Sequence, residues 1–338
     1  MNSFVLEDDV RQFAERFELR KELHGKSFLI TGATGLIGSI LIKCLLALDE
    51  DIDISIPVRS MEKATKVFGN AVGKLNVEVI SSLTEWSKRQ EGTYDYIVHC
   101  ASPTNGKYIE SHPTETFDLA YQTTKNMLEW GTHFDCFLYV SSLEYYGQVL
   151  DDKLITEDME GYIDTKSPRS AYPLGKRAAE ELCKSFAREY GIPAKIARLT
   201  QTFGAGVAED DNRVFAQFAR SAIRGEDIIL HTKGMSAKPY CYTTDAISAM
   251  LYILLKGDNG EAYNVANKDS YISICDLAHF VQERFNRNAK VVISLNDSLG
   301  YAPQTMLRLD ISKIEQLGWH PIYNLEDMFS RLIAYMSD

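Results

Sequence analysis

Long apolar runs and basic charge are both scarce in this sequence of 338 residues. The longest apolar stretch, LIGSILIKCLLAL at residues 36–48, is interrupted by Gly38, Ser39 and Lys43. It falls short of the roughly 18 uncharged residues that a membrane-spanning helix needs. The first residues, MNSFVLEDDVRQF, are acidic where a secretory signal is basic. We therefore expect a cytoplasmic protein with no membrane contact.

Paired cysteines and metal-binding motifs are also missing. The six cysteines are scattered without a CxxC pair, which is typical of reduced thiols. The seven histidines include no HExxH motif, so we expect no metal site. A formal net charge of −11 argues against a nucleic-acid-binding surface, because phosphate binding needs a basic face. Any anionic ligand must therefore be held by a local group of cations.

What the sequence does contain is a regular alternation of short apolar runs and helical patterns from Lys26 onward. Strands that are buried on both faces need no polar alternation, and continuous apolar runs of this kind are typical of them. The alternation predicts an α/β fold with a doubly wound parallel sheet. The expected strands read SFLIT, DISIPV, NVEVI, YDYIVHC, CFLYVSS, AKIARLT and AYNVAN.

A glycine-rich turn follows the first expected strand. Residues 28–38 read FLITGATGLIG, with Gly32, Gly35 and Gly38 spaced three apart. Without side chains, the backbone N–H groups can reach a pyrophosphate, and the start of the next helix adds partial positive charge. In this strand–turn–helix setting the glycines predict a Rossmann-like dinucleotide-binding site.

The end of the second strand bears on the choice of dinucleotide. An acidic residue normally follows this strand and binds the ribose 2′-hydroxyl, but Arg59 and Ser60 stand here instead. Arg59 could pair with a 2′-phosphate or stack on adenine, which favours NADP over NAD. The alternative is a solvated Arg59 with NAD bound.

Two further segments carry groups suited to proton transfer. YVSSLEYYG, at residues 139–147, ends a strand, and strand carboxyl ends line the ligand crevice of an open α/β sheet. A serine hydroxyl there can bond a reacting oxygen. Glu144 could carry a proton or cap the next element.

The second segment, AYPLGKRAAEE at residues 171–181, places Tyr172 and Lys176 on one helical face. Pro173 suits the first turn of a helix. An ammonium at about 4 Å supplies the roughly 4 kcal/mol needed to lower a phenol pKa by about three units. We therefore interpret Tyr172 as a base tuned by Lys176. Gly175 costs about 1 kcal/mol in a helix, and we interpret it as room for the cofactor.

These residues resemble the extended short-chain dehydrogenase/reductase family, in particular its nucleotide-sugar epimerases, dehydratases and decarboxylases. The resemblance covers roughly residues 25–335. It rests on TGATGLIG, HCAS, SSLEYYG, YPLGK and KPYCYTTDA, and PRSAYPLGKRAAE is similar to the matching segment of UDP-glucuronate decarboxylases. It implies a catalytic set of Ser142, Tyr172 and Lys176, assisted by Glu144.

The resemblance also implies binding residues. Those for the cofactor are Gly32, Thr34, Gly35, Leu36, Ile37, Gly38, Arg59, Ser60, Ser82, Leu83, Ala101, Ser102, Ser141, Tyr172, Lys176, Leu199 and Thr202. Those for a nucleoside-diphosphate sugar are Arg198, Thr200, Arg213 and Lys238.

Four positions depart from the family pattern. Leu143 precedes Glu144 where dehydratases carry an Asp–Glu pair, so elimination loses its usual acid. Lys238 stands where many members have arginine, and it offers a point charge without the bidentate fork. Ala120 and Ser82 replace a common asparagine and a common acidic residue.

The chain is expected to divide into three parts. Residues 1–24 form a helical extension, with Val10, Phe13 and Phe17 on one apolar face. Residues 25–204, with about 240–267, form the NAD(P)-binding Rossmann domain. Residues 205–239 and 268–338 form a smaller substrate-binding lobe. A homodimer is expected through the helices TETFDLAYQTTKNMLEW and KRAAEELCKSFAREY.

The predicted function is transient oxidation of a sugar hydroxyl to a ketone, followed by epimerisation, decarboxylation or elimination. The alternatives are an NADPH-dependent reductase of a sugar or carbonyl substrate, and a catalytically silent cofactor-binding protein.

Overall fold

A parallel sheet forms the centre of the computed structural model, which describes residues 4–89, 92–296 and 304–338. Its seven strands are ordered β11-β7-β5-β4-β1-β2-β3, and every neighbouring pair is parallel. The strands are β1 (Ser27–Thr31), β2 (Asp53–Val58), β3 (Asn76–Val79), β4 (Tyr94–His99), β5 (Phe134–Ser142), β7 (Ala194–Leu199) and β11 (Ala262–Val265). The predicted α/β Rossmann-like fold is confirmed.

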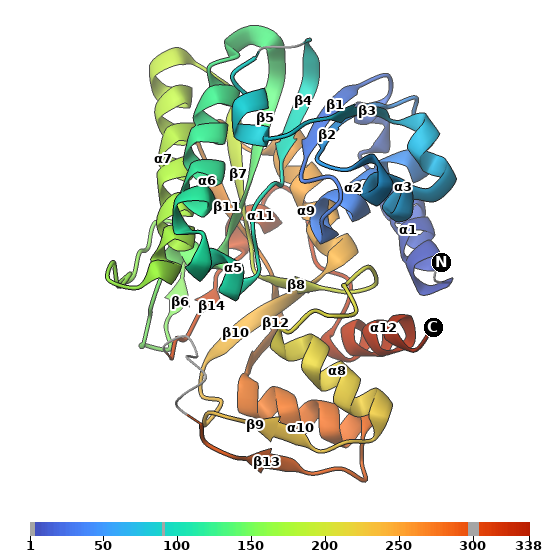
Figure 1. The fold of residues 1–338 in the computed structure, drawn as a ribbon, viewed down its shortest axis with the longest axis vertical. Coiled ribbons are helices and arrows are strands. Elements are labelled where there is room, and N and C mark those ends of the chain that lie inside the picture. The colour runs from blue at the N-terminus through green and yellow to red at the C-terminus, as the bar shows by residue number, and fades with distance from the viewer. Residues whose placement is uncertain (1–3, 90–91, 297–303) are drawn as a thin grey trace.

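The two faces of the sheet bury different helices, as Figure 1 shows. In β1, Phe28 and Ile30 pack into one core with helices α2 (Leu36–Ala47), α3 (Met61–Phe68) and α9 (Thr243–Lys256). Leu29, between them, packs into the opposite core with α6 (Pro113–Leu128) and α7 (Ala171–Tyr190). Successive side chains of a strand point to opposite faces of the sheet. Because both faces of β1 are buried, the side chains on both faces are apolar.

A smaller lobe lies below the sheet in Figure 1. Its three-stranded sheet has the order β12-β10-β8, and its own core contains Phe203, Phe215 and Phe329. Its elements are β8 (Gln201–Phe203), α8 (Val214–Arg224), β9 (Ile228–Leu230), β10 (Ala237–Tyr242), β12 (Asn267–Ser273), α10 (Ile274–Phe285), β13 (Val291–Ile293) and α12 (Leu325–Ser337).

The division of the cores differs in two respects from the expected domain ranges. Phe203 and Tyr242, which those ranges assigned to the Rossmann domain, pack into the core of the smaller lobe. Leu307, Ile314 and Trp319, which the sequence analysis assigned to the smaller lobe, pack into the core of the larger unit. The remaining elements are α4 (Leu83–Trp86), α5 (Gly106–Ser111), β6 (Leu154–Ile155), β14 (Arg308–Leu309), α11 (Ser312–Glu315) and the 3-10 turns η1 (Arg20–Leu23), η2 (Gly69–Lys74), η3 (Gly131–His133), η4 (Leu143–Tyr146) and η5 (Pro168–Ser170).

The N-terminal segment forms helix α1 (Phe4–Arg16), which packs against α2, α9 and α12. Its Asp9 is 2% exposed and accepts hydrogen bonds from the Tyr242 hydroxyl and from Arg331, both at 2.6 Å. Since Tyr242 ends β10 and Arg331 lies on α12, Asp9 fixes α1 to the smaller lobe. Residues 1–3 lie outside the described part of the chain.

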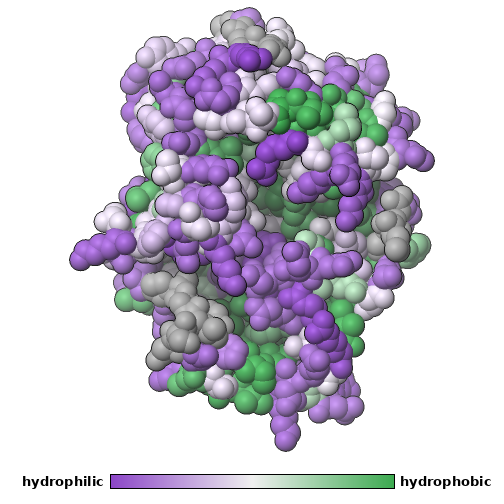
Figure 2. All heavy atoms as spheres, in the orientation of Figure 1, coloured by the Kyte–Doolittle hydropathy of each residue, from purple (hydrophilic) through white to green (hydrophobic). Residues whose placement is uncertain are grey.

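The surface agrees with this arrangement. Figure 2 shows one face covered mainly by hydrophilic side chains, with apolar ones visible in a hollow between the upper and lower parts. Across residues 4–89, 92–296 and 304–338, none of the helices is both long and apolar enough to traverse a bilayer.

Candidate active site

A cleft of about 230 Å³ lies at the carboxyl ends of the central strands, between the sheet and the smaller lobe. The sheet order reverses between β1 and β4, which is where open α/β sheets bind ligands. Of the predicted site residues, the cleft is lined by Gly32, Gly35, Leu36, Ile37, Gly38, Ser102, Ser141, Ser142, Glu144, Tyr172, Lys176, Leu199, Thr200, Thr202, Arg213 and Lys238.

The glycine turn is packed so closely against neighbouring backbone that side chains at two of its positions would clash. Gly32 has a φ of +67°, and a Cβ there would lie 2.7 Å from the backbone nitrogen of Ala101. A Cβ on Gly38 would lie 2.5 Å from the Gly32 oxygen. Helix α2 starts at Leu36, and the first N–H groups of a helix have no partner within it. The residue before α2, Gly35, has no side chain that could cap them. This cradle fits the pyrophosphate of a dinucleotide.

Lys176 is a buried residue of the cleft lining, held in place by β5. It is 3% exposed, and its Nζ donates a 2.8 Å hydrogen bond to the Val140 oxygen of β5. The same Nζ lies 4.8 Å from the Tyr139 ring centroid and 5.6 Å from that of Tyr172. Burial lowers the pKa of Lys176 to about 8, because a charged ammonium loses its hydration there.

Tyr172 lies above Lys176 on the same face of α7. Burial, the largest influence, raises the pKa of Tyr172 to about 12, and the negative charge of Glu144 adds to the rise. Hydrogen bonds from Ser142 and Ser102 oppose it. Burial of the phenolate thus outweighs the positive charge of Arg169, and the tuning of Tyr172 by Lys176 together with oxidised nicotinamide stays a prediction.

Gly175 serves helix packing rather than cofactor access. A Cβ at Gly175 would lie 3.1 Å from the Ala120 Cβ and 3.6 Å from the Phe117 Cα, both on α6. The interpretation of Gly175 as room for the cofactor is therefore wrong. Ala120 and Gly175 are small because α6 and α7 cross closely at this point.

Arg198 does not reach the cleft, which contradicts its predicted role in substrate binding. Its guanidinium forms a 2.7 Å ion pair with Glu180, and both side chains are 0% exposed. Glu180 also accepts a hydrogen bond from Ser141 at 2.5 Å. The Arg198 guanidinium lies 3.5 Å from the Tyr145 ring centroid. A buried cation needs a buried partner, and Glu180 supplies it.

Glu144 pairs with a residue that the sequence analysis missed. Its carboxylate lies 3.0 Å from the Arg169 guanidinium, and the two side chains are 38% and 35% exposed. Ser142, rather than Glu144, caps the following turn, by accepting a 3.2 Å hydrogen bond from the Glu144 N–H. The capping interpretation of Glu144 is therefore wrong, and its role as a proton carrier stays a prediction. Arg169 stands three residues before Tyr172, inside the stretch PRSAYPLGKRAAE on which the resemblance rests.

The cleft is also lined by two cationic side chains, Arg213 and Lys238. Arg213 pairs with Asp211 at 2.5 Å, and Lys238 Nζ lies 3.5 Å from Gln201 Oε1. Burial lowers the pKa of Lys238. The hydroxyls of Thr200 and Thr202 donate to the backbone oxygens of Pro239 and Thr200, at 2.6 and 3.0 Å.

Some predicted cofactor residues lie outside the cleft lining. Arg59 is exposed, and Ser60 and Ser82 act as N-caps of α3 and α4. Their place after β2 and β3, beside the glycine turn, leaves an adenosine contact as a prediction. The residues not brought into the cleft lining are Thr34, Arg59, Ser60, Ser82, Leu83, Ala101 and Arg198.

Comparison with known proteins now decides the family. Residues 28–266 match the family described as "NAD dependent epimerase/dehydratase family". The chain belongs to this family. It is an NAD-dependent enzyme of the extended short-chain dehydrogenase/reductase type, as the sequence motifs predicted.

Relatives of known sequence extend over most of the chain. UDP-glucuronic acid decarboxylase 5 of Arabidopsis thaliana is 28% identical over 305 residues, which cover 88% of this chain and 86% of the relative. UDP-glucuronic acid decarboxylase 1 of Danio rerio is 25% identical over 319 residues, covering 92% and 73%.

Solved structures share the fold. UDP-glucose 4-epimerase of Thermotoga maritima, solved with UDP-glucose, has a TM-score of 0.75 at 22% identity and covers 91% of this chain and 98% of its own. UDP-glucuronic acid 4-epimerase of Bacillus cereus, in complex with UDP-glucuronic acid and NAD, has a TM-score of 0.74 at 20% identity, covering 92% and 98%.

Proposed function

We propose that this enzyme binds a nucleoside-diphosphate sugar and oxidises one sugar hydroxyl transiently, with Tyr172 as the base. The observation that carries the proposal is the arrangement around Tyr172, whose hydroxyl has Ser142 and Ser102 as hydrogen-bond partners and whose ring centroid lies 5.6 Å from Lys176 Nζ. A sugar hydroxyl in the cleft would take its place in the same network. Tyr172 would then accept the proton and later return it.

Gly32, Gly35 and Gly38 would hold the pyrophosphate of the cofactor in the cleft that Tyr172 also lines. Oxidised NAD(P) would supply the hydride acceptor and a positive charge. Tyr172, whose pKa burial raises to about 12, would ionise more readily beside a positive charge. Lys176 keeps the region positive and holds the end of β5 through Val140.

The charge of the cleft supports an anionic substrate. Arg213 and Lys238 both line the cleft, in a chain whose formal net charge is −11. A diphosphate there would gain from both cations and would compete with Asp211 for Arg213. We place the sugar between this pair and Tyr172.

Among the possible outcomes we favour decarboxylation of a UDP-hexuronate. The relatives named above are UDP-glucuronic acid decarboxylases, and this chain keeps a glutamate at position 144. Glu144 and Arg169 form an ion pair at the rim, so each is held close to the position of the sugar. Leu143 offers no second acid for elimination.

The test of this proposal is chemical identification of what the purified enzyme carries and converts. Denatured protein should release a nicotinamide dinucleotide, and UDP-glucuronate should give UDP-pentose and carbon dioxide without net change in cofactor absorbance. A panel of UDP-glucose, UDP-glucuronate and dTDP-glucose separates the three outcomes. Bound cofactor without turnover of any of them would favour the catalytically silent alternative.

Net reduction is the second candidate function, and Arg59 favours it. The side chain follows β2 and is exposed, where it could meet a 2′-phosphate of NADP. If the released dinucleotide is NADP and its reduced form is consumed steadily with a carbonyl substrate, the reductase is the correct function. Release of NAD would remove this argument.

We also propose a homodimer through α6 and α7. These helices pack on one face of the sheet, and a hollow between them is lined by Phe117, Leu174 and Ala178 together with Arg177 and Glu181. Apolar side chains with charges of both signs suit a symmetric contact. Light scattering of the purified protein should give twice the mass of one chain. The Ala178→Glu variant should give the mass of a single chain.

A further inference from the structure

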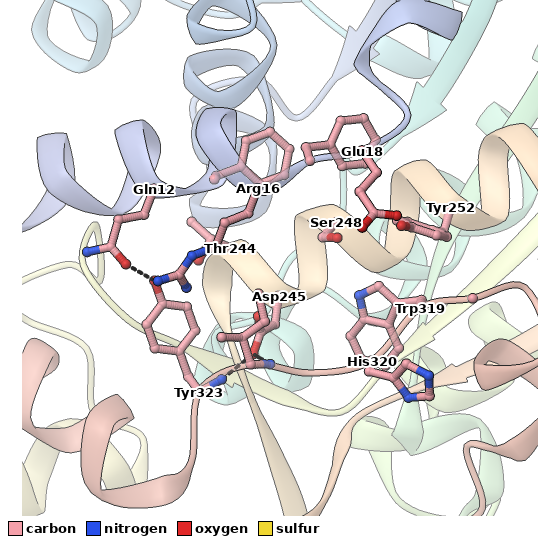
Figure 3. A pocket seen from close by; sticks show the side chains of 14 residues that line it. Gln12, Arg16, Glu18, Thr244, Asp245, Ser248, Tyr252, Trp319, His320 and Tyr323 are labelled. Carbon is pink, nitrogen blue, oxygen red and sulfur yellow. Dashed lines mark hydrogen bonds between the residues drawn. The ribbon is translucent and has the colours of Figure 1, made fainter.

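A second cavity lies outside the active-site cleft, between α1, the first turns of α9 and the segment at residues 318–323 (Figure 3). Its volume is about 200 Å³. This is well above the ~10–15 Å³ that one water needs, so the cavity has room for a small organic ligand.

Two buried polar groups at this cavity have no hydrogen-bond partner among the described residues. These are Nε1 of Trp319, which is 1% exposed, and Oγ1 of Thr244, which is 5% exposed. Figure 3 shows the indole nitrogen of Trp319 directed into the cavity, toward Ser248. A buried donor without a partner costs about 1–3 kcal/mol. A ligand with a hydrogen-bond acceptor would therefore remove this cost at Trp319 and Thr244.

Charges of both signs surround the same space. Asp245 is 2% exposed, and its Oδ2 accepts 3.0 Å hydrogen bonds from the N–H groups of Ile322 and Tyr323. Arg16, on the last turn of α1, forms no ion pair or hydrogen bond with any described residue, although its charge acts on Asp245. Burial raises the pKa of Asp245 to about 7, and Glu18 also lines this space. A purely anionic ligand would meet these two acids, and a purely cationic one would meet Arg16.

Apolar rings complete the walls. Phe13 and Phe17 stack with centroids 5.2 Å apart, and Phe17 meets the Tyr252 ring edge-on at 6.0 Å. All three line the cavity. They offer a contact surface for an aliphatic or aromatic side chain.

We propose that this cavity binds a small zwitterion of the α-amino acid class with an apolar side chain. Its carboxylate would accept from Trp319 Nε1 and Arg16, and its ammonium would donate to Asp245. Its side chain would lie against Phe13 and Phe17. Such a ligand satisfies the unpartnered donors and matches both charges, which a neutral sugar or a simple ion does not.

Occupancy of the cavity would join three segments that are far apart in the sequence. Arg16 belongs to α1, Asp245 to α9, and Trp319 to the segment before α12. A ligand that contacts all three stabilises the folded chain by mass action. We therefore expect a rise in the midpoint of thermal unfolding that grows with ligand concentration.

The test uses the full chain with three probes of one skeleton, measured by calorimetric titration. L-leucine should bind saturably. L-leucinamide, which lacks the carboxylate, and N-acetyl-L-leucine, which lacks the ammonium, should each bind at least about tenfold more weakly, since each loses a hydrogen bond to a charged group. L-methionine and L-phenylalanine extend the panel. Equal binding of the blocked derivatives, or no saturable binding by any of the three amino acids, overturns the proposal.

Matched variants locate the binding. Trp319→Phe removes the indole N–H but keeps a ring, and Arg16→Gln removes the charge; each should weaken binding about tenfold. The control Arg11→Gln changes the same charge on the same helix, outside this cavity, and should leave binding unchanged. Asp245 is left intact because it holds the backbone at residues 322 and 323. Unchanged binding in both cavity variants would place the site elsewhere and overturn the proposal.

Discussion

Two neighbouring parts of the active-site cleft are built in different ways. Around Tyr172, the supporting groups are buried and fixed: Lys176 is 3% exposed, and the pair of Glu180 and Arg198 is fully buried. Beside them, Glu144 and Arg169 form an ion pair with more than a third of each side chain exposed. A buried pair cannot be broken cheaply, whereas an exposed pair is worth about 0–1 kcal/mol. The buried part can therefore hold Tyr172 in one position, whereas the exposed pair can rearrange.

Removing the Tyr172 hydroxyl should have the largest effect on activity. Tyr172→Phe deletes the group that takes the proton and keeps the ring, so turnover should fall about 10²- to 10⁴-fold, with nucleotide still bound. Tyr190→Phe, at the exposed end of the same helix, is the matched control and should be fully active. Retained turnover in the Tyr172 variant would show that the buried part of the cleft is not the reaction centre.

Breaking the buried pair of Glu180 and Arg198 should lower the free energy of unfolding more than any of the other substitutions. Glu180→Ala leaves Arg198 as an unpaired buried cation, and we expect the free energy of unfolding to fall by about 3–5 kcal/mol. Glu189→Ala changes an exposed residue of the same helix, outside the proposed dimer contact, and should cost less than about 1 kcal/mol. Urea denaturation of both variants measures the difference. Similar losses in the two would mean that the buried pair gives no special support.

The exposed pair should affect activity more than stability. Glu144→Gln keeps the shape but removes the charge, so turnover should fall about 10- to 100-fold while stability changes by less than about 1 kcal/mol. Glu129→Gln removes one carboxylate from a surface pair with Lys125 and serves as the control. If Glu144→Gln destabilises the fold and leaves turnover intact, the pair is structural.

These outcomes separate what the sequence could predict from what it could not. Gly32, Gly35 and Gly38, and likewise Tyr172 and Lys176, are close in the chain, so their spacing alone puts them on one turn or one helical face. The partner of Arg198 could not be read this way, because Glu180 reaches it across the contact between α7 and β7. The same holds for Gly175, where a larger side chain would collide with Ala120 on α6.

A smaller effect should appear in the pH dependence of stability. The pKa of Lys176 is lowered from 10.5 to about 8 in the folded chain, so between these values the unfolded chain binds more protons. Stability therefore rises with pH across this window, by about 1–3 kcal/mol. Lys176→Met lacks this contribution, and the difference between wild type and variant, measured by urea denaturation at several pH values, should follow it. Parallel pH profiles would mean that Lys176 stays protonated in the folded state throughout the window.

The central claim is that hydride leaves the sugar and returns to it within one catalytic cycle. UDP-glucuronate carrying deuterium at single ring carbons, analysed by mass spectrometry of the product, tests it most directly. The account predicts that deuterium at the oxidised carbon slows turnover and is retained in the product, with no net consumption of cofactor. Loss of that deuterium to the nicotinamide, with stoichiometric cofactor consumption, would contradict it.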